Sequence, residues 1–119
     1  MNFSIMIHES AEVFAQRDDP AQRAILFAPI GAYLQALRDA GVFVGGAGLE
    51  PPRTASVLSP SGDGWQVQDG PFADTKEQLA GLIIVDVPDR AKALEWARRF
   101  PATAGRRLEL RANLVPPQE

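Results

Sequence analysis

The order of strand-like and helix-like segments is the feature of this chain that most constrains its fold. Apolar residues recur at helical spacing after Asp19-Pro20 and again after Pro88-Asp89. Between and around these helices, segments rich in β-formers or alternating between apolar and polar residues predict strands. The predicted order is strand, helix, strand, a hairpin of strands, a long strand, helix and strand. The expected strands cover residues 3–7, 42–44, 54–58, 65–68, 79–87 and 108–114.

Capping residues mark the ends of the predicted helices. Asp19 suits an N-cap, Pro20 suits the first helical position, and Gly41 suits a C-terminal cap. Pro29 lies inside the first helical pattern, where it removes a backbone hydrogen bond, so we expect a kink or two consecutive helices. The second helix should end before Pro101, because the residue that precedes a proline is disfavoured in helical conformation.

This order is that of a ferredoxin-like α+β sandwich with an inserted β-hairpin. In that fold the helices cover one face of a mainly antiparallel sheet. The length of 119 residues fits a single domain over 1–119. The first strand should be buried on both faces, and apolar alternation in several other strands predicts that the second sheet face packs against another copy. We therefore expect a homodimer.

The side-chain inventory excludes several kinds of site. The chain has no cysteine and one histidine, which excludes disulfides, thiolate metal sites and multi-histidine metal sites within one chain. We predict no metal and no cofactor. The net charge of −3 argues against nucleic-acid binding. The lack of a long apolar run predicts no membrane association, and the lack of a basic leader makes the cytoplasm the expected location.

A glycine-rich segment, Gly45–Gly48, resembles a phosphate-binding loop at first sight. Pro51-Pro52 follows it, so no helix N-terminus is available to hold a phosphate. We therefore favour a bulged or closely packed strand end here.

Three segments resemble the DGPF group within the YciI-like (YCII-related) family. The longest runs from Asp69 to Gly81 and reads DGPFADTKEQLAG. The others are LRDAGV at 37–42, followed by Gly45-Gly46 and LEPP at 49–52, and the helix at 91–100 before Pro101. The resemblance implies a dimeric α/β-barrel built from two ferredoxin-like subunits. It also implies an association with extracytoplasmic-function sigma factors as partners.

The resemblance raises a question about catalysis. Some relatives use a histidine on the first helix with a nearby aspartate as an acid–base pair, and that helix position falls on Ile30 here. The histidine of this chain, His8, lies instead at the end of the first predicted strand. The helix pair is therefore absent, unless His8 replaces it from another element.

Asp69 and His8 are the candidate catalytic residues. Asp69 could act as a general base if a cleft raised its pKa, or it could cap its own turn. His8, near Glu9, could poise a base near neutral pH, or it could be structural. Lys76 could assist them, bind an anionic ligand, or pair with Asp69 or Asp74.

The candidate ligand-binding residues are Gly70, Pro71, Phe72, Lys76 and Tyr33. Gly70 should meet a backbone requirement and Pro71 should fix the chain after it. Phe72 either lines a pocket or packs in the core. Tyr33 lies on the apolar helix face and should pack in the core with its hydroxyl at a polar rim.

Other large side chains have simpler expected roles. Trp65 and Trp96 are predicted to be packing residues. The basic pairs Arg98-Arg99 and Arg106-Arg107 are predicted to be solvated surface, with docking to an acidic partner as the alternative.

The sequence supports two hypotheses of function. The leading one is a dimeric module that binds a small molecule or a protein partner, in sigma-factor-linked regulation. The alternative is a small enzyme that transfers a proton or carries out an elimination, using Asp69 with His8 or Lys76. The enzyme requires Asp69 and His8 to lie within reach of a common point.

Overall fold

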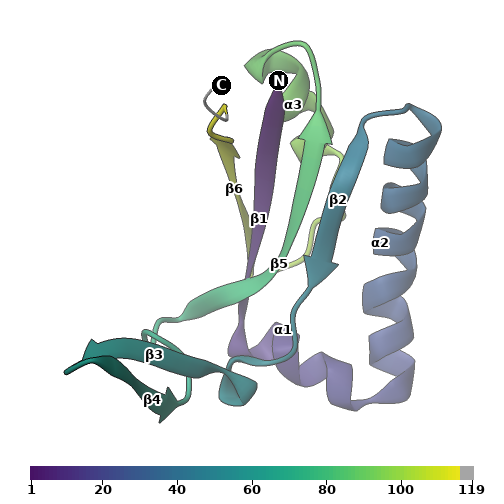
Figure 1. The fold of residues 1–119 in the computed structure, drawn as a ribbon. Coiled ribbons are helices and arrows are strands. Elements are labelled where there is room, and N and C mark those ends of the chain that lie inside the picture. The colour runs from purple at the N-terminus through teal and green to yellow at the C-terminus, as the bar shows by residue number, and fades with distance from the viewer. Residues whose placement is uncertain (116–119) are drawn as a thin grey trace.

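The computed structural model describes residues 1–115, which form an α+β structure with antiparallel sheets (Figure 1). The main sheet has the strand order β2-β5-β1-β6, and every adjacent pair is antiparallel. Its strands are β1 (Asn2–Ser10), β2 (Phe43–Gly48), β5 (Glu77–Asp86) and β6 (Arg106–Ala112). Helix α2 (Pro20–Asp39) precedes β2, and α3 (Arg90–Arg98) connects β5 to β6. This arrangement is consistent with the predicted ferredoxin-like fold.

Helix α2 begins and ends where its capping residues predict. The Asp19 side chain accepts a hydrogen bond from the Ala21 backbone N–H at 3.2 Å, and Pro20 is the first helical residue. Gly41, just beyond the helix, has a φ of 73°, which glycine adopts without strain. The helix continues through Pro29, so the alternative of two consecutive helices is wrong.

Helix α3 also follows its prediction. The Asp89 side chain accepts a hydrogen bond from the Lys92 backbone N–H at 2.9 Å, and the helix ends at Arg98, before Pro101. Strand β6 begins earlier than expected, and Leu114 lies beyond its end.

A short helical segment between β1 and α2 was missing from the predicted order. It consists of α1 (Ala11–Ala15) and a 3-10 turn, η1 (Gln16–Asp18). The Ser10 side chain caps α1 by accepting from the Val13 backbone N–H at 3.4 Å. Five residues are too few to show a helical period in the sequence.

The core lies on one face of the main sheet, because α2 and α3 both pack on that face (Figure 1). In β1, Phe3, Ile5 and Ile7 are buried, whereas Met6 and His8 on the other face are only half-buried. The expectation that the first strand is buried on both faces is therefore wrong for the single chain. The core residues are Phe3, Ile5, Ile7, Phe14, Tyr33, Leu37, Ala80, Ile83, Val85, Val87, Ala93, Trp96, Ala97 and Phe100.

Strands β3 (Ser56–Ser61) and β4 (Gly64–Asp69) form a separate two-stranded sheet that projects from the body of the molecule (Figure 1). A turn at Gly62-Asp63 joins them, and Gly62 has a φ of 59°. Trp65 is 66% exposed, so within the single chain it does not have the predicted packing role. The reason is that this sheet stands apart from the helices and has no core of its own.

No helix within residues 1–115 is both long and apolar enough to cross a membrane.

Candidate functional site

A cavity of about 310 Å³ lies between α2 and the β2–β5 half of the main sheet. Phe27, Ile30 and Leu34, spaced three and four residues apart, form its wall on α2. Ile30 is the position at which the family resemblance implied a histidine. This wall of the cavity is therefore apolar, and it carries no acid–base group at that position.

Glycines on the facing strands leave the cavity unfilled. Gly46 and Gly48 of β2 pair with Ile83 and Gly81 of β5, and all four residues line the cavity. A Cβ atom at Gly46 would lie 2.6 Å from the Leu82 carbonyl oxygen, so the strands can approach this closely only with glycine there. A Cβ atom at Gly48 would meet no atom within 4 Å. Beneath α2, the sheet thus contributes no side chain at these glycines, whereas Ile7, Ala80 and Ile83 line other parts of the cavity.

The glycine-rich segment is therefore a strand and not a phosphate loop. Residues 43–48 form β2, with an irregularity in register between Phe43 and Gly45. This confirms the bulged, closely packed strand that the following prolines predicted.

A buried carboxylate lies beside the cavity and bridges two arginines. Glu9, at the end of β1, is 3% exposed. Its Oε2 accepts from Arg106 Nε at 2.8 Å, and Arg106 Nη2 lies 2.7 Å from the same oxygen. Its Oε1 accepts from Arg17 Nη2 at 3.3 Å. Because a buried charge requires a partner, this cluster fixes β1, β6 and the segment before α2 relative to one another.

Arg17 connects this cluster to the cavity wall. It donates through Nη1 to the Leu49 carbonyl oxygen, and its guanidinium lies 4.7 Å from the ring centre of Phe14 and 5.4 Å from that of Phe27. Its Nε is buried and has no acceptor among residues 1–115. An unsatisfied buried donor in a cavity wall marks a place where a water molecule or a ligand atom can bind.

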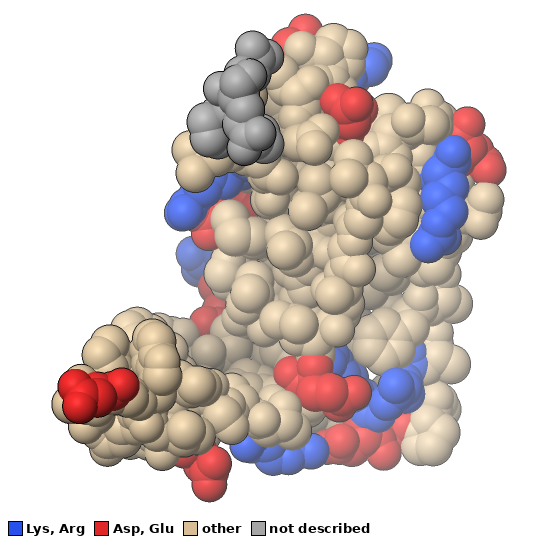
Figure 2. Space-filling model, viewed as in Figure 1, with Lys and Arg blue, Asp and Glu red and all other residues tan. Residues whose placement is uncertain are grey.

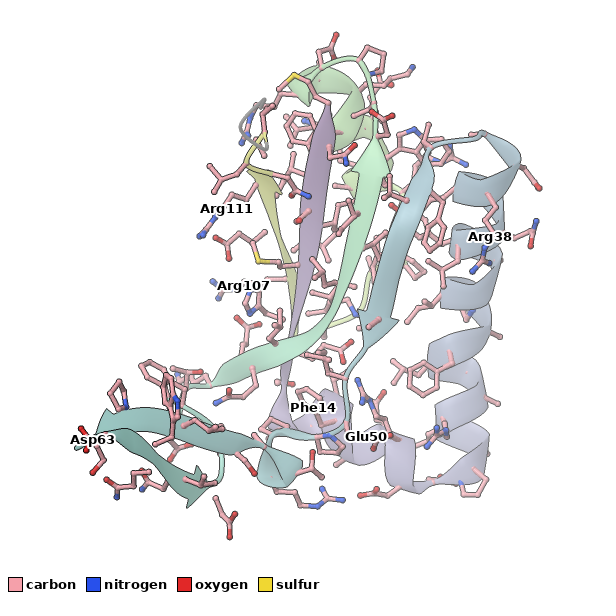
Figure 3. The ribbon with its side chains drawn as sticks, viewed as in Figure 1. Phe14, Arg38, Glu50, Asp63, Arg107 and Arg111 are labelled. Carbon is pink, nitrogen blue, oxygen red and sulfur yellow. The ribbon has the colours of Figure 1, made fainter. Side chains whose placement is uncertain are left out.

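Arg38 lies on α2 toward the opposite end of the cavity (Figure 3). Its guanidinium packs over the Phe43 ring, 4.8 Å from the ring centre. Among the described residues, the Arg38 side chain forms no salt bridge. The cavity therefore combines apolar walls with one paired and one unpaired arginine.

The structure does not bring the candidate catalytic residues together. His8 lies on the sheet face opposite the core, where its Nε2 is 3.3 Å from Glu109 Oε1. The pKa of Glu109 is lowered, mainly by a hydrogen bond from Arg111 and to a smaller extent by His8. Asp69 lies at the exposed end of β4. No hydrogen bond or ion pair joins Asp69 to His8 in the described residues, and neither lines the cavity.

The residues after Asp69 lie at the base of the projecting sheet. Gly70 has a φ of 101° and donates its N–H to the Ala55 carbonyl oxygen at 2.8 Å, so it meets the expected backbone requirement. Pro71 and Lys76 line a second depression, of about 290 Å³, next to α1. Phe72 is 91% exposed, so the prediction that it packs in the core is wrong, and it borders a further surface depression.

Tyr33 lies in the core between α2 and α3. Its hydroxyl donates to the Trp96 carbonyl oxygen at 2.8 Å, and its ring packs edge-on against Phe100. Burial raises the pKa of Tyr33 to about 12, although the charge of Arg99 opposes the shift. Its packing role is confirmed, and Tyr33 does not line the cavity.

The burial of Glu9 has a usable signal in the sequence, whereas its two arginine partners have none. Phe3, Ile5 and Ile7 alternate along β1 on the face that the structure buries, and the same alternation places residue 9 on that face. The expectation that Arg106 is solvated is wrong, since its side chain is 3% exposed. Arg106 can be buried because Glu9 neutralises it, and the two lie 97 residues apart in the sequence.

Two comparisons place the chain among known proteins. A family model described as YCII-related domain matches residues 1–111. An uncharacterised protein of Rhizobium meliloti (strain 1021) is 44% identical over 52 residues, which cover 44% of this chain and 42% of that protein. The chain thus matches less than half the length of this relative.

Within residues 1–115, no three histidine, aspartate or glutamate side chains are grouped so that they could hold a metal ion.

Proposed function

The chain belongs to the YCII-related domain family, and from that premise we propose that it is a dimeric module that binds a small molecule in the cavity beneath α2. The cavity is the observation that carries the proposal. Its volume of about 310 Å³ lies at the lower end of the range for small-molecule sites, and its mostly apolar walls with a few polar groups are typical of them.

The open face of the main sheet supports a homodimer. Met6, Leu82 and Ile84 lie on this face and are only half-buried, and Val44 and Leu79 are 51% and 40% exposed. Figure 2 shows a broad uncharged surface over these strands, with charged side chains along the β6 edge. A sheet of this kind is stable when a second layer covers its apolar face, and a second copy of the same sheet is a self-complementary partner. Two copies packed in this way would form the dimeric α/β-barrel.

The projecting β3–β4 sheet supports the same arrangement. Leu58 pairs with Val67 and Pro60 with Trp65, so these four side chains share one face. Leu58, Val67 and Trp65 are between 55% and 66% exposed. Because an isolated two-stranded hairpin is marginally stable in water, we expect this apolar face to pack on the second subunit.

A role in regulation extends the proposal to a protein partner. Its support is the likeness of residues 69–81 to the signature linked with extracytoplasmic-function sigma factors. The cognate sigma factor should be retained by the immobilised dimer at micromolar concentration. Failure to retain any sigma factor encoded next to this chain would count against the regulatory role and would leave the binding role in place.

Light scattering after size-exclusion chromatography tests the dimer. We expect a dimer at low micromolar concentration, and we expect Ile84→Arg to prevent dimerisation by burying a charge at the interface. Ile25→Arg is the matched control, because Ile25 is 75% exposed on α2, away from the open sheet face. A wild-type monomer with a normal melting transition would refute the dimer.

Filling the cavity tests the binding role. Gly48→Leu places a side chain in the cavity without meeting an atom at its Cβ position. We expect it to suppress the fluorescence enhancement of 8-anilinonaphthalene-1-sulfonate while the melting temperature is retained. Gly64→Leu is the control, because Gly64 lies on β4 and its Cβ would also meet open space. Equal fluorescence in all three proteins would show that the cavity is not the site.

A further inference from the structure

We propose that the cavity takes an elongated apolar molecule with a carboxylate or similar small anion at one end, and that Arg38 binds this anion. The inference rests on the proposed binding function and adds the chemical class of the ligand. It follows from the shape of the cavity, from its charge, and from the position of Arg38.

The shape of the cavity favours an extended ligand. The lining residues of α2 are Phe27, Ile30, Leu34 and Arg38, which form a single stripe along the helix. At about 1.5 Å per residue, this stripe spans roughly 16 Å. The glycines of β2 form the opposite wall and allow an apolar chain to lie close to the backbone of the sheet.

The charge of the cavity favours an anion. Glu9, Arg17 and Arg38 are the charged residues in its lining. The Glu9 carboxylate is already bound by Arg17 and by the buried Arg106, so it offers no free charge to a cationic ligand. Arg38 remains without an acidic partner in the described residues. A cationic group would be repelled here, whereas an anion would be attracted.

The position of Arg38 suits it to hold a carboxylate. Its guanidinium is packed over the Phe43 ring, and an aromatic ring beneath a guanidinium restricts its orientation while leaving the N–H groups at its edge available. Two of these N–H groups match the two oxygens of a carboxylate. Arg38 therefore places the anion at one end of the apolar stripe.

Octanoate and octanamide separate the contribution of charge from that of the apolar chain, because they share the same alkyl tail. Calorimetric titration of the wild-type protein should show octanoate binding about tenfold more tightly than octanamide. Arg38→Gln should remove this difference and leave octanamide binding unchanged. The matched control is Arg99→Gln, which removes an arginine packed 4.1 Å over the Trp96 ring, outside the cavity lining. Gly48→Leu should abolish binding of both compounds.

Each other outcome has a distinct meaning. Equal binding of octanoate and octanamide would overturn the anion inference and leave the cavity as a binding site. A preference for octanoate that survives Arg38→Gln would overturn the role of Arg38. No binding of either compound to the wild-type protein would overturn both this inference and the proposed function.

Discussion

Replacing Glu9 by leucine should unfold the protein much more readily, because it leaves a buried arginine without its counter-ion. The side chains of Glu9 and Arg106 are both 3% exposed, and their closest atoms lie 2.7 Å apart. Breaking a buried ion pair by removing one partner costs about 3–5 kcal/mol. A chain of this length has a free energy of unfolding of about 6–18 kcal/mol, so the loss is a large fraction of the total.

Urea unfolding at a fixed protein concentration measures this loss, since the stability of a dimer depends on concentration. A loss of about 4 kcal/mol should lower the urea midpoint by about 2 M. Adding Arg106→Leu to Glu9→Leu should restore part of the stability, because an apolar pair can replace a buried ion pair at little cost. Arg17, whose side chain is 12% exposed, still lacks its counter-ion in the double variant. Glu95→Gln, which alters an exposed carboxylate on α3, away from the open sheet face, should produce no measurable change.

Two results would refute this reasoning. A loss below about 1 kcal/mol for Glu9→Leu would place the pair in the class of exposed ion pairs. A double variant no more stable than Glu9→Leu would show that the penalty does not come from an unpaired Arg106.

Two further predictions concern packing and pH. Gly46→Ala should destabilise the protein by about 1–3 kcal/mol, because its Cβ would lie 2.6 Å from the Leu82 carbonyl oxygen, whereas Gly48→Ala should be tolerated; equal effects in urea unfolding would contradict the described strand contact. Tyr33 has its pKa raised from 10.0 to about 12, so the unfolded chain loses this proton first and stability should fall as pH rises from about 10 to 12. Tyr33→Phe should remove this part of the alkaline fall and cost about 1–2 kcal/mol at neutral pH, because the Trp96 carbonyl loses its donor; an unchanged alkaline slope would refute the assignment.

The placement of the candidate site shows where reasoning from sequence stops. The motif that begins at Asp69 is recognisable because its residues are contiguous, yet it lies at the base of the projecting sheet and not at the cavity. His8 is a candidate because the chain has one histidine, yet it lies on the sheet face opposite the cavity. Rare residues and contiguous motifs attract attention in a sequence, whereas the cavity is made of common residues that meet only in the folded chain.

The sequence by itself determined the order of the strands and of the two long helices, the cap at Asp19, and the alternation of side chains along β1. These features depend on neighbours a few residues away, through hydrogen bonds at helix ends and through the alternation of side chains along a strand. Only the tertiary structure decided that the glycines of β2 lie beneath α2 and that Glu9 meets Arg106, 97 residues away. The physical reason is strand register: pairing across the sheet fixes which distant residues share a site, and no local pattern encodes it.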